Sequence, residues 1–336
     1  MRPVADAKPR NAMLRRTLLA AAASLAPASA GGAVAPPVVR LGVLVFGTAQ
    51  WVARVIRRHR LDQAHGFMLR TEALANNGGG TVALLGGSVD IIVSDWLFVG
   101  IERAHGLPLR FAPFSSATGA LLLRRGSAIR SLRDLAGRRL GVAGGPYDKS
   151  WMIVRAAARQ RDSIDLARAA NVIYAAPPLL SAKLAQGELD AVLTFWNFAA
   201  ALEVAGFRPL VTVAACAHTL GLPDPLPILG YVFKQAWAES APSRIEGFLA
   251  ASAAAERILT DSDAEWDAIR PLMNAPDDRL FTRLKVGFRA GIVHATPALA
   301  QQAADRLFAV LHAVGGTAAT GGLSRLPPGV FWAAPS

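Results

Sequence analysis

The 336-residue sequence contains one cysteine and comparatively few charged residues. Because Cys216 has no second cysteine to pair with, an intrachain disulfide is excluded. Charged residues make up 18% of the chain and hydrophobic residues 52%, which argues against intrinsic disorder and allows a large buried core. The apolar run at 18–25 is shorter than the roughly 20 residues needed to cross a bilayer. The length is sufficient for two domains.

Common enzyme signatures are also missing. The sequence has no G-x-G-x-x-G, Walker A or G-x-S-x-G pattern, so nucleotide binding and a serine hydrolase elbow are not indicated. Its six histidines are spread out, with no His-x-x-x-His pair and no cysteine partner. We therefore expect no metal site, no cofactor and no catalytic residues.

The first 30 residues have the pattern of a secretory signal. Five basic residues precede the apolar run at 18–25, and Ala28 and Ala30 form an A-x-A cleavage site. The pair Arg15 and Arg16 also fits twin-arginine export, so the Sec and twin-arginine routes both stay open. No cysteine lies near the cleavage site, and we expect a soluble periplasmic protein without a lipid anchor.

The formal net charge is +12, but the basic residues form no long run. They are scattered along the chain, as the pairs at 57–58, 124–125 and 138–139 illustrate. This distribution is typical of a solvated surface, and we expect no nucleic-acid partner.

Two stretches of the chain repeat each other. Four residues recur exactly 100 positions later: Leu84, Gly87, Asp90 and Trp96 return as Leu184, Gly187, Asp190 and Trp196. In addition, an apolar strand followed by a turn and a tryptophan occurs at 40–51 and again at 139–151. Such repetition predicts two equivalent α/β halves. Asp90 and Asp190 precede strands, and we interpret them as structural turn residues.

Strands and helices alternate through most of the chain, which predicts parallel, doubly wound sheets. The first half has strands at 38–46, 67–74, 90–93 and 109–114, and the second at 140–142, 172–174, 191–194 and 210–214. We expect 119–124 to be the crossover into the second half and 230–233 a strand that returns to the first. Thr81 is expected to cap a helix through Leu85, helices predominate after 242, and 315–336 is expected to be irregular.

Functional residues are expected just beyond the carboxyl ends of the strands, where ligands bind in open parallel sheets. Four tryptophans follow strands in this way, two in each half, and we predict that their indoles line one cleft. The predicted ligand-binding residues are Thr48, Gln50, Trp51, Ser94, Asp95, Trp96, Ser115, Ser116, Gly145, Tyr147, Asp148, Lys149, Trp151, Thr194, Trp196 and Asn197.

These residues leave the charge of the ligand open. Aromatic rings with the carboxylates of Asp95 and Asp148 favour a flat or cationic ligand, through stacking and cation–π contacts. Serines and helix N-terminal N–H groups instead favour an oxyanion. A purely structural alternative for Asp148 is that it caps the helix that starts at Ser150.

Three segments carry a resemblance to a known family. The segments LRDLAGRRLGV at 132–142, LAQGELDA at 184–191 followed by Trp196, and LGGSVD at 85–90 are similar to motifs of the periplasmic substrate-binding proteins of ABC importers, in the nitrate/taurine/alkanesulfonate (NMT1-like) group. The similarity covers most of residues 38–260. The sequence departs from the group at 47–51, where GTAQW replaces the usual pattern after the first strand. The thiamine-pyrimidine synthases share the fold, but their cysteine-rich motif is missing from this sequence.

The resemblance implies an α/β, two-lobed periplasmic-binding-protein fold of type II, in which each lobe is a mostly parallel sheet flanked by helices. Lobe 1 would comprise 38–123 and 230–336, and lobe 2 would comprise 124–229, linked by a hinge of two crossovers. Such a protein captures a small organic solute between its lobes and delivers it to an ABC permease and its ATPase; we expect a monomer. Two alternatives stay open: a lyase or dehydratase using Asp95 or Asp148 as acid or base, and a periplasmic sensor or accessory binding protein.

Overall fold

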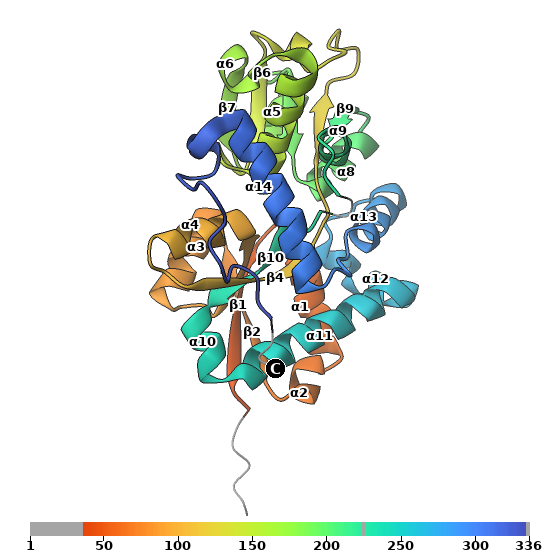
Figure 1. Ribbon diagram of the computed structural model, residues 1–336. Coiled ribbons are helices and arrows are strands. Elements are labelled where there is room, and N and C mark those ends of the chain that lie inside the picture. The colour runs from red at the N-terminus through yellow and green to blue at the C-terminus, as the bar shows by residue number, and fades with distance from the viewer. Residues whose placement is uncertain (1–35, 224–225, 334–336) are drawn as a thin grey trace, which may run out of the picture. The chain divides into compact units, whose positions relative to one another are not determined.

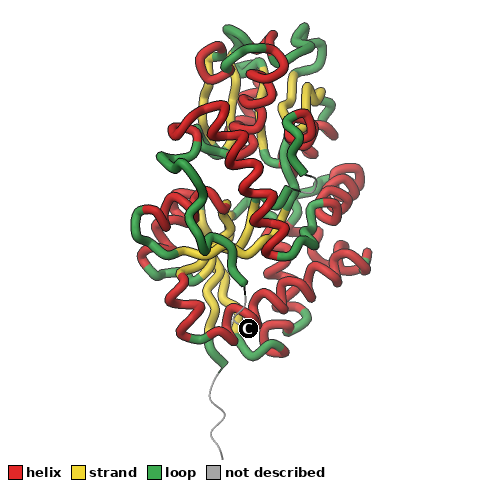
Figure 2. The backbone as a smooth tube through the Cα atoms, in the orientation of Figure 1, coloured by secondary structure: helices red, strands yellow, loops and turns green. Residues whose placement is uncertain are grey.

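The strands of the protein form two five-stranded sheets, which Figures 1 and 2 show flanked by helices. The computed structural model describes residues 36–223 and 226–333. The predicted signal peptide at 1–30, with its twin-arginine pair, lies outside the described residues. Within them, no helix combines the length and the apolar character that crossing a membrane would require.

The first sheet has the strand order β2-β1-β3-β10-β4. Its strands are β1 (Val38–Leu44), β2 (Met68–Leu74), β3 (Ile91–Asp95), β4 (Leu109–Ser115) and β10 (Leu229–Lys234). The β1 strand pairs parallel with β2 and β3, whereas β10 pairs antiparallel with both β3 and β4.

The second sheet repeats this topology with the order β7-β6-β8-β5-β9. Its strands are β5 (Ala120–Leu123), β6 (Arg139–Ala143), β7 (Asn171–Ala175), β8 (Ala191–Thr194) and β9 (Arg208–Thr212). Here β5 is the antiparallel strand, between β8 and β9. The predicted α/β architecture with two equivalent halves is therefore confirmed, with each sheet mixed rather than wholly parallel.

The antiparallel strands come from the two crossovers between the halves. The first residue of β5, Ala120, pairs with Thr194 at the end of β8, and the first residue of β10, Leu229, pairs with Asp95 at the end of β3. Each crossover thus enters its new sheet at the carboxyl edge and must run against the neighbouring strands. As a consequence, Ala120–Leu123 belongs to the second sheet, and the lobe boundary that we expected after residue 123 lies before residue 120.

The helices cover the faces of the two sheets. In chain order they are α1 (Ala49–Arg58), α2 (Leu61–Ala64), α3 (Asn77–Gly86), α4 (Trp96–Ala104), α5 (Lys149–Asp162), α6 (Leu166–Ala169), α7 (Pro177–Gln186), α8 (Trp196–Val204), α9 (Val213–Thr219), α10 (Gln235–Ser240), α11 (Pro242–Asp261), α12 (Asp263–Ile269), α13 (Asp278–Ala290) and α14 (Pro297–Ala319), with 3₁₀ turns at η1 (Arg133–Leu135) and η2 (Arg270–Leu272).

Local hydrogen bonds correct several predicted boundaries. The α3 helix starts at Asn77 rather than at Thr81, because the side chain of Asn76 accepts a hydrogen bond from Gly79 N at 2.8 Å and caps the helix. The predicted strand at 210–214 ends at Thr212, whose hydroxyl accepts a hydrogen bond from Ala215 N at 3.1 Å and starts α9. The short helices α9 and α10 were not predicted.

The repeated residues of the two halves occupy equivalent positions. Gly87 and Gly187 follow α3 and α7 in the left-handed conformation, with φ of 77° and 81°, which glycine adopts without steric strain. Three residues later, Asp90 and Asp190 accept hydrogen bonds from the backbone and guanidinium groups of Arg40 and Arg139. Their interpretation as structural residues is confirmed.

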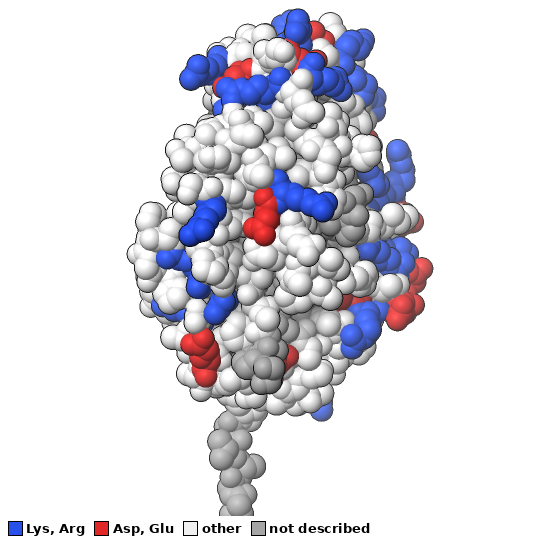
Figure 3. Space-filling model, viewed as in Figure 1, with Lys and Arg blue, Asp and Glu red and all other residues white. Residues whose placement is uncertain are grey.

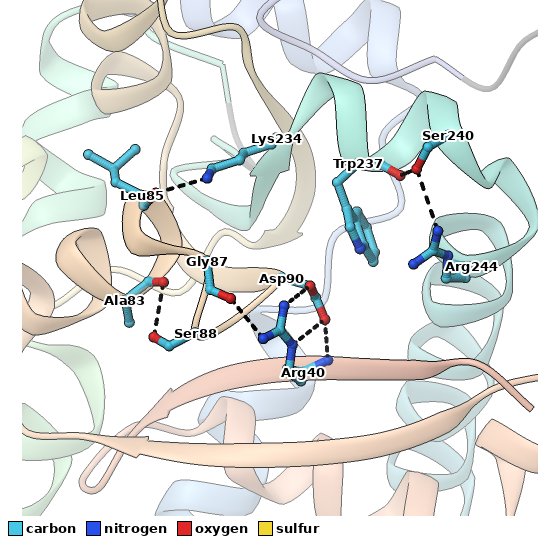
Figure 4. A network of polar contacts seen from close by, with 10 residues as sticks. All are labelled: Arg40, Ala83, Leu85, Gly87, Ser88, Asp90, Lys234, Trp237, Ser240 and Arg244. Atoms are coloured by element: carbon cyan, nitrogen blue, oxygen red, sulfur yellow. Dashed lines mark hydrogen bonds and ion pairs between the residues drawn. The ribbon is translucent and has the colours of Figure 1, made fainter.

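The contact in the first half is the tighter of the two. Figure 4 shows the Arg40 guanidinium donating to both oxygens of Asp90 and to the carbonyl of Gly87, with Nη2–Oδ1 at 2.6 Å. The corresponding distance between Arg139 and Asp190 is 3.3 Å. Lys234 of β10 donates to the carbonyl of Leu85 at the end of α3, so three elements are joined in this region.

We expect Asp90→Asn to lower the free energy of unfolding by about 1 to 2 kcal/mol, because it removes charge-assisted hydrogen bonds from a buried carboxylate. The matched variant Asp190→Asn should cost less, since that carboxylate is more exposed and its ion pair is longer. Urea unfolding of both variants measures the difference; an equal or larger loss for Asp190→Asn would contradict the prediction.

The C-terminal segment spans both halves. Helix α14 packs against α5 of the second half and β4 of the first, and Figure 1 shows it lying across both. The helix extends to Ala319, although we expected the irregular segment to begin at residue 315, and Gly316 interrupts it with φ of 61° and ψ of −160°. Beyond it, the predicted irregular tail runs along the edge strand β4, where Phe111 exchanges backbone hydrogen bonds with Val330 and Trp332 at 2.8 Å. The tail therefore covers a sheet edge.

The basic residues are unevenly distributed over the surface. In Figure 3 many Lys and Arg side chains gather at the end that carries α5, α6 and β7. Three of them share one counter-ion, since Asp165 lies within 4 Å of the guanidinium groups of Arg155, Arg159 and Arg168. Some arginines of this region thus form local ion pairs with the same carboxylate.

Candidate functional site

A cavity of about 150 Å³ lies at the carboxyl ends of strands from both sheets. Side chains of the first half meet side chains of the second around it, which is the location expected for ligands of open α/β sheets. The lining residues are Gly42, Val43, Leu44, Phe46, Gly47, Thr48, Ala49, Leu74, Asn77, Gly80, Ile92, Val93, Ser94, Asp95, Phe114, Ser115, Ala117, Thr118, Gly119, Asp148, Ser150, Phe195, Trp196, Asn197, Ile228 and Leu229.

The cavity brings together part of the predicted set. From the first half these residues are Thr48, Ser94, Asp95 and Ser115; from the second they are Asp148, Trp196 and Asn197. Residues that follow different strands, and that are distant in sequence, therefore meet at one place as the topology requires.

The prediction that four indoles line one cleft is wrong for three of them. Trp51 is 2% exposed, and Trp96 and Trp151 are completely buried. Trp51 packs edge-on against Trp266 at 5.9 Å between ring centroids. Side chains in a first helical turn point sideways and back toward the helix start, so these rings fill the space between helix and sheet instead of projecting beyond the strand. Trp196 lines the cavity.

The other predicted residues that do not line the cavity have local roles. Gln50 donates to the carbonyl of Val45 at 3.4 Å, and the Ser116 hydroxyl donates to the carbonyl of Gly291 at 3.3 Å. Thr194 is buried behind the cavity wall, whereas Tyr147 is 56% exposed. Gly145 belongs to the positive-φ turn that precedes α5.

Sequence reasoning missed much of the cavity wall. Phe46, Phe114 and Phe195 line it, together with aliphatic residues from several strands. Apolar residues at strand ends look the same in sequence as core residues, so no pattern identifies them. Asn77 and Ser150, however, lie in the first turns of α3 and α5, and their position at helix starts was a usable signal.

Lys149 and Asp95 form an ion pair between the two halves. The Lys149 ammonium lies 2.9 Å from Oδ1 of Asp95, with side-chain exposures of 5% and 22%. Lys149 also donates to the carbonyl of Tyr147 at 3.0 Å, and Asp95 caps α4 by accepting from Phe98 N at 2.8 Å. A cation from the second half is thus held by a carboxylate of the first, beside the cavity rather than in its wall.

Asp148 both caps a helix and lines the cavity. Its Oδ1 accepts a hydrogen bond from Trp151 N at 3.2 Å, and α5 begins at the next residue. Burial raises the pKa of this carboxyl to about 6, against the opposing charge of Lys149, and the charge of Asp95 adds to the increase. The structural alternative, in which Asp148 caps this helix, is therefore confirmed, with the helix starting at Lys149 rather than at Ser150, and Asp148 also lines the cavity.

We expect Asp148→Asn to stabilise the protein above pH 6 by about 3 kcal/mol. A carboxyl whose pKa is higher in the folded state disfavours folding when it is ionised, and this penalty is absent below pH 4, grows up to pH 6 and then stays constant. Asparagine caps helices as well as aspartate does, so the helix start is retained. Urea unfolding of both proteins from pH 4 to 8 measures the difference; a gap independent of pH would contradict the prediction.

Further contacts join the halves around the cavity. Asn197 donates to the carbonyl of Phe46 at 3.3 Å, and the rings of Trp51 and Trp196 meet edge-on at 6.0 Å between centroids. Arg283 of α13 lies 3.0 Å from Glu203 of α8. The two halves thus contact each other through polar, aromatic and ionic pairs on several sides of the cavity.

Cys216 and the potential metal ligands were the other groups of chemical interest. Burial raises the pKa of the Cys216 thiol to about 11, so it is a poor nucleophile at neutral pH. Across residues 36–223 and 226–333, no three His, Cys, Asp or Glu side chains come together in a way that could hold a metal ion.

Several solved structures share this fold. The alkanesulfonate-binding protein SsuA from Xanthomonas axonopodis pv. citri, bound to MOPS, is 17% identical with a TM-score of 0.70, over 89% of this chain and 99% of that chain. The periplasmic aliphatic sulphonate-binding protein SsuA from Escherichia coli is 19% identical with a TM-score of 0.64, over 84% and 94%. The periplasmic nitrate-binding protein NrtA from Synechocystis PCC 6803 is 12% identical with a TM-score of 0.56, over 72% and 67%. At these identities the likeness establishes the two-lobed fold.

The sequence comparisons add the family. No curated protein sequence matches the chain. The sequence model of the NMT1/THI5-like family matches residues 63–263, which is more than half of the chain. The matched range includes strands of both sheets and the residues of the second half that line the cavity. The duplicated sheet topology and this match agree with the resemblance seen in the motifs at 85–90, 132–142 and 184–191. The chain belongs to the NMT1/THI5-like family.

Proposed function

We propose that the protein is an extracytoplasmic solute-binding protein that captures a small organic solute in the cavity between its two halves and delivers it to an ABC permease and its ATPase. The observation that carries the proposal is the cavity itself, because its wall is built from both sheets. A solute there contacts both lobes at once and can stabilise their closure.

The size of the cavity limits the solute. A volume of about 150 Å³ is about that of a cavity that holds one benzene molecule. The fold relatives named above bind sulfonates or nitrate, which are also small molecules. A solute of a few non-hydrogen atoms with an apolar body fits the aromatic and aliphatic wall.

The connections between the halves support a closing motion. The chain passes between the sheets from β4 to β5 and again from β9 to β10, so two crossovers form the hinge. The cavity is complete within one chain, which supports a monomeric protein. Export to the periplasm is proposed from the pattern at 1–30, which lies outside the described residues.

Tryptophan fluorescence tests the proposal through Trp196. Titration with a panel of small amines, sulfonates, carboxylates and heterocycles is expected to change the emission of the folded protein for at least one compound, because this indole lines the cavity. The change should disappear in Trp196→Phe. It should persist in Trp237→Phe, a partly buried tryptophan that packs on Phe233 away from the cavity.

A flat response to every compound, in protein shown to be folded by circular dichroism, would contradict the proposed function. Turnover of a bound compound would favour the enzyme alternative instead. In that case Asp148→Asn would retain binding and abolish turnover, whereas a binding protein returns the compound unchanged.

A further inference from the structure

The charges in the cavity wall have one sign. Two carboxylates, Asp95 and Asp148, line the cavity, and its lining residues include no Lys, Arg or His. The buried cation Lys149 is not among the lining residues, although its ammonium lies 2.9 Å from Oδ1 of Asp95. Residues at helix starts, such as Asn77 and Ser150, also line the cavity, and their N–H groups attract anions. Without a cationic side chain in the wall, however, an anionic solute would still be repelled by the two carboxylates.

The two carboxylates differ in their partners. Asp95 is compensated by the ammonium of Lys149 at 2.9 Å. Asp148 takes part in no ion pair within 4 Å among the residues that the structure describes. Its Oδ1 accepts the capping bond from Trp151 N, the N–H of Ser150 also bonds to the carboxylate, and the charge of Lys149 acts on it from a greater distance. Asp148 is thus the carboxylate of the wall that has no direct ion pair.

The remaining wall suits an organic cation. Phe46, Phe114, Phe195 and Trp196 line the same cavity. Aromatic faces attract ammonium and amidinium groups through cation–π contacts, and they also stack on flat apolar bodies. A carboxylate together with aromatic rings therefore favours a positively charged group attached to a compact apolar body.

We propose that the cavity selects a small organic cation, a protonated amine or amidine on an apolar body about the size of benzene, with Asp148 as the partner of its charged group. This inference rests on the proposed solute-binding function and adds the class of solute. It separates this chain from the fold relatives that bind sulfonates and nitrate.

The proposal predicts a characteristic pH dependence. The charged groups that face Asp148 are Lys149 at the start of α5 and Asp95 at the end of β3, and with burial they place its pKa at about 6. Only the ionised carboxylate pairs with a cation. The affinity for a cationic probe should therefore be constant above pH 7 and fall about tenfold for each pH unit well below 6.

Three probes of similar shape and different charge test the proposal: benzylamine, benzyl alcohol and benzoate, each titrated calorimetrically into the full chain at pH 7.5 and 5. We expect benzylamine to bind most tightly at pH 7.5. Asp148→Asn, which keeps the helix cap, should weaken benzylamine at least tenfold and leave benzyl alcohol unchanged. Asp277→Asn is the matched control, because Asp277 caps α13 in the same way and does not line the cavity.

The outcomes separate this inference from the function on which it rests. Tighter binding of benzoate or benzyl alcohol, or a benzylamine affinity that Asp148→Asn does not reduce, would overturn the cation assignment while the solute-binding function stands. Binding by none of the three probes, together with a flat tryptophan response to the wider panel, would overturn both.

Discussion

Replacing Asp95 by asparagine is expected to lower the free energy of unfolding by about 3 kcal/mol, because it leaves the buried ammonium of Lys149 without its partner. Asparagine retains the cap on α4, so the loss of the helix cap does not contribute. Since the pair joins the first half to the second, the variant should also loosen the contact between the lobes beside the cavity.

Urea unfolding measures this effect against two further variants. Asp277 caps α13 and forms no ion pair with another described residue. Asp277→Asn should therefore lower the free energy of unfolding by well under 1 kcal/mol. The double variant Asp95→Asn with Lys149→Met should recover most of the loss, because it leaves no unpaired buried ammonium. A double variant as unstable as Asp95→Asn alone would contradict the explanation.

Gly119→Ala is expected to destabilise the protein by about 3 kcal/mol, through overpacking at the first crossover. A Cβ atom at this position would lie 1.6 Å from the carbonyl oxygen of Thr194 and 3.2 Å from Cα of Phe195. Both neighbours are backbone atoms, so no side chain can rotate away. Relief requires moving β5 away from β8, which breaks the pairing of Ala120 with Thr194.

The control for Gly119→Ala is Gly86→Ala. Gly86 ends α3, has no neighbour within 4 Å of an added Cβ and does not have a positive φ, so alanine there should be neutral or slightly stabilising. Thermal and urea unfolding compare the two. Because Gly119 also lines the cavity, the response of Trp196 to solute should weaken in Gly119→Ala as well. Equal stabilities of the two variants would show that the crossover tolerates displacement.

The alternation of elements and the 100-residue repeat were sufficient to predict the architecture. Buried parallel strands are continuous apolar runs, and Gly187 with Asp190 repeats the capping glycine and arginine-binding aspartate of the first half. These signals are local, because each depends on the backbone conformation of a few neighbouring residues. The direction of β5 and β10 depended instead on where the crossovers enter each sheet, which no local pattern encodes.

For the site, the sequence indicated that the candidate residues lie just beyond the carboxyl ends of the strands. It did not indicate which of them reach the cavity. Asp95, Asp148 and Trp196 follow strands as predicted and line it. Trp51, Trp96 and Trp151 occupy equivalent chain positions and are buried, because the direction of a side chain at a helix start depends on what packs beside it.

The electrostatics of the site depended on tertiary structure. Lys149 and Asp95 are 54 positions apart in the chain and belong to different halves, yet they form an ion pair beside the cavity. Burial of the neighbouring Asp148 raises the pKa of its carboxyl to about 6. The sequence alone determined two α/β halves with polar and aromatic residues at their strand ends. Only the packing of one half on the other decided which charges are compensated, since Coulomb interactions depend on distances and burial that chain order does not specify.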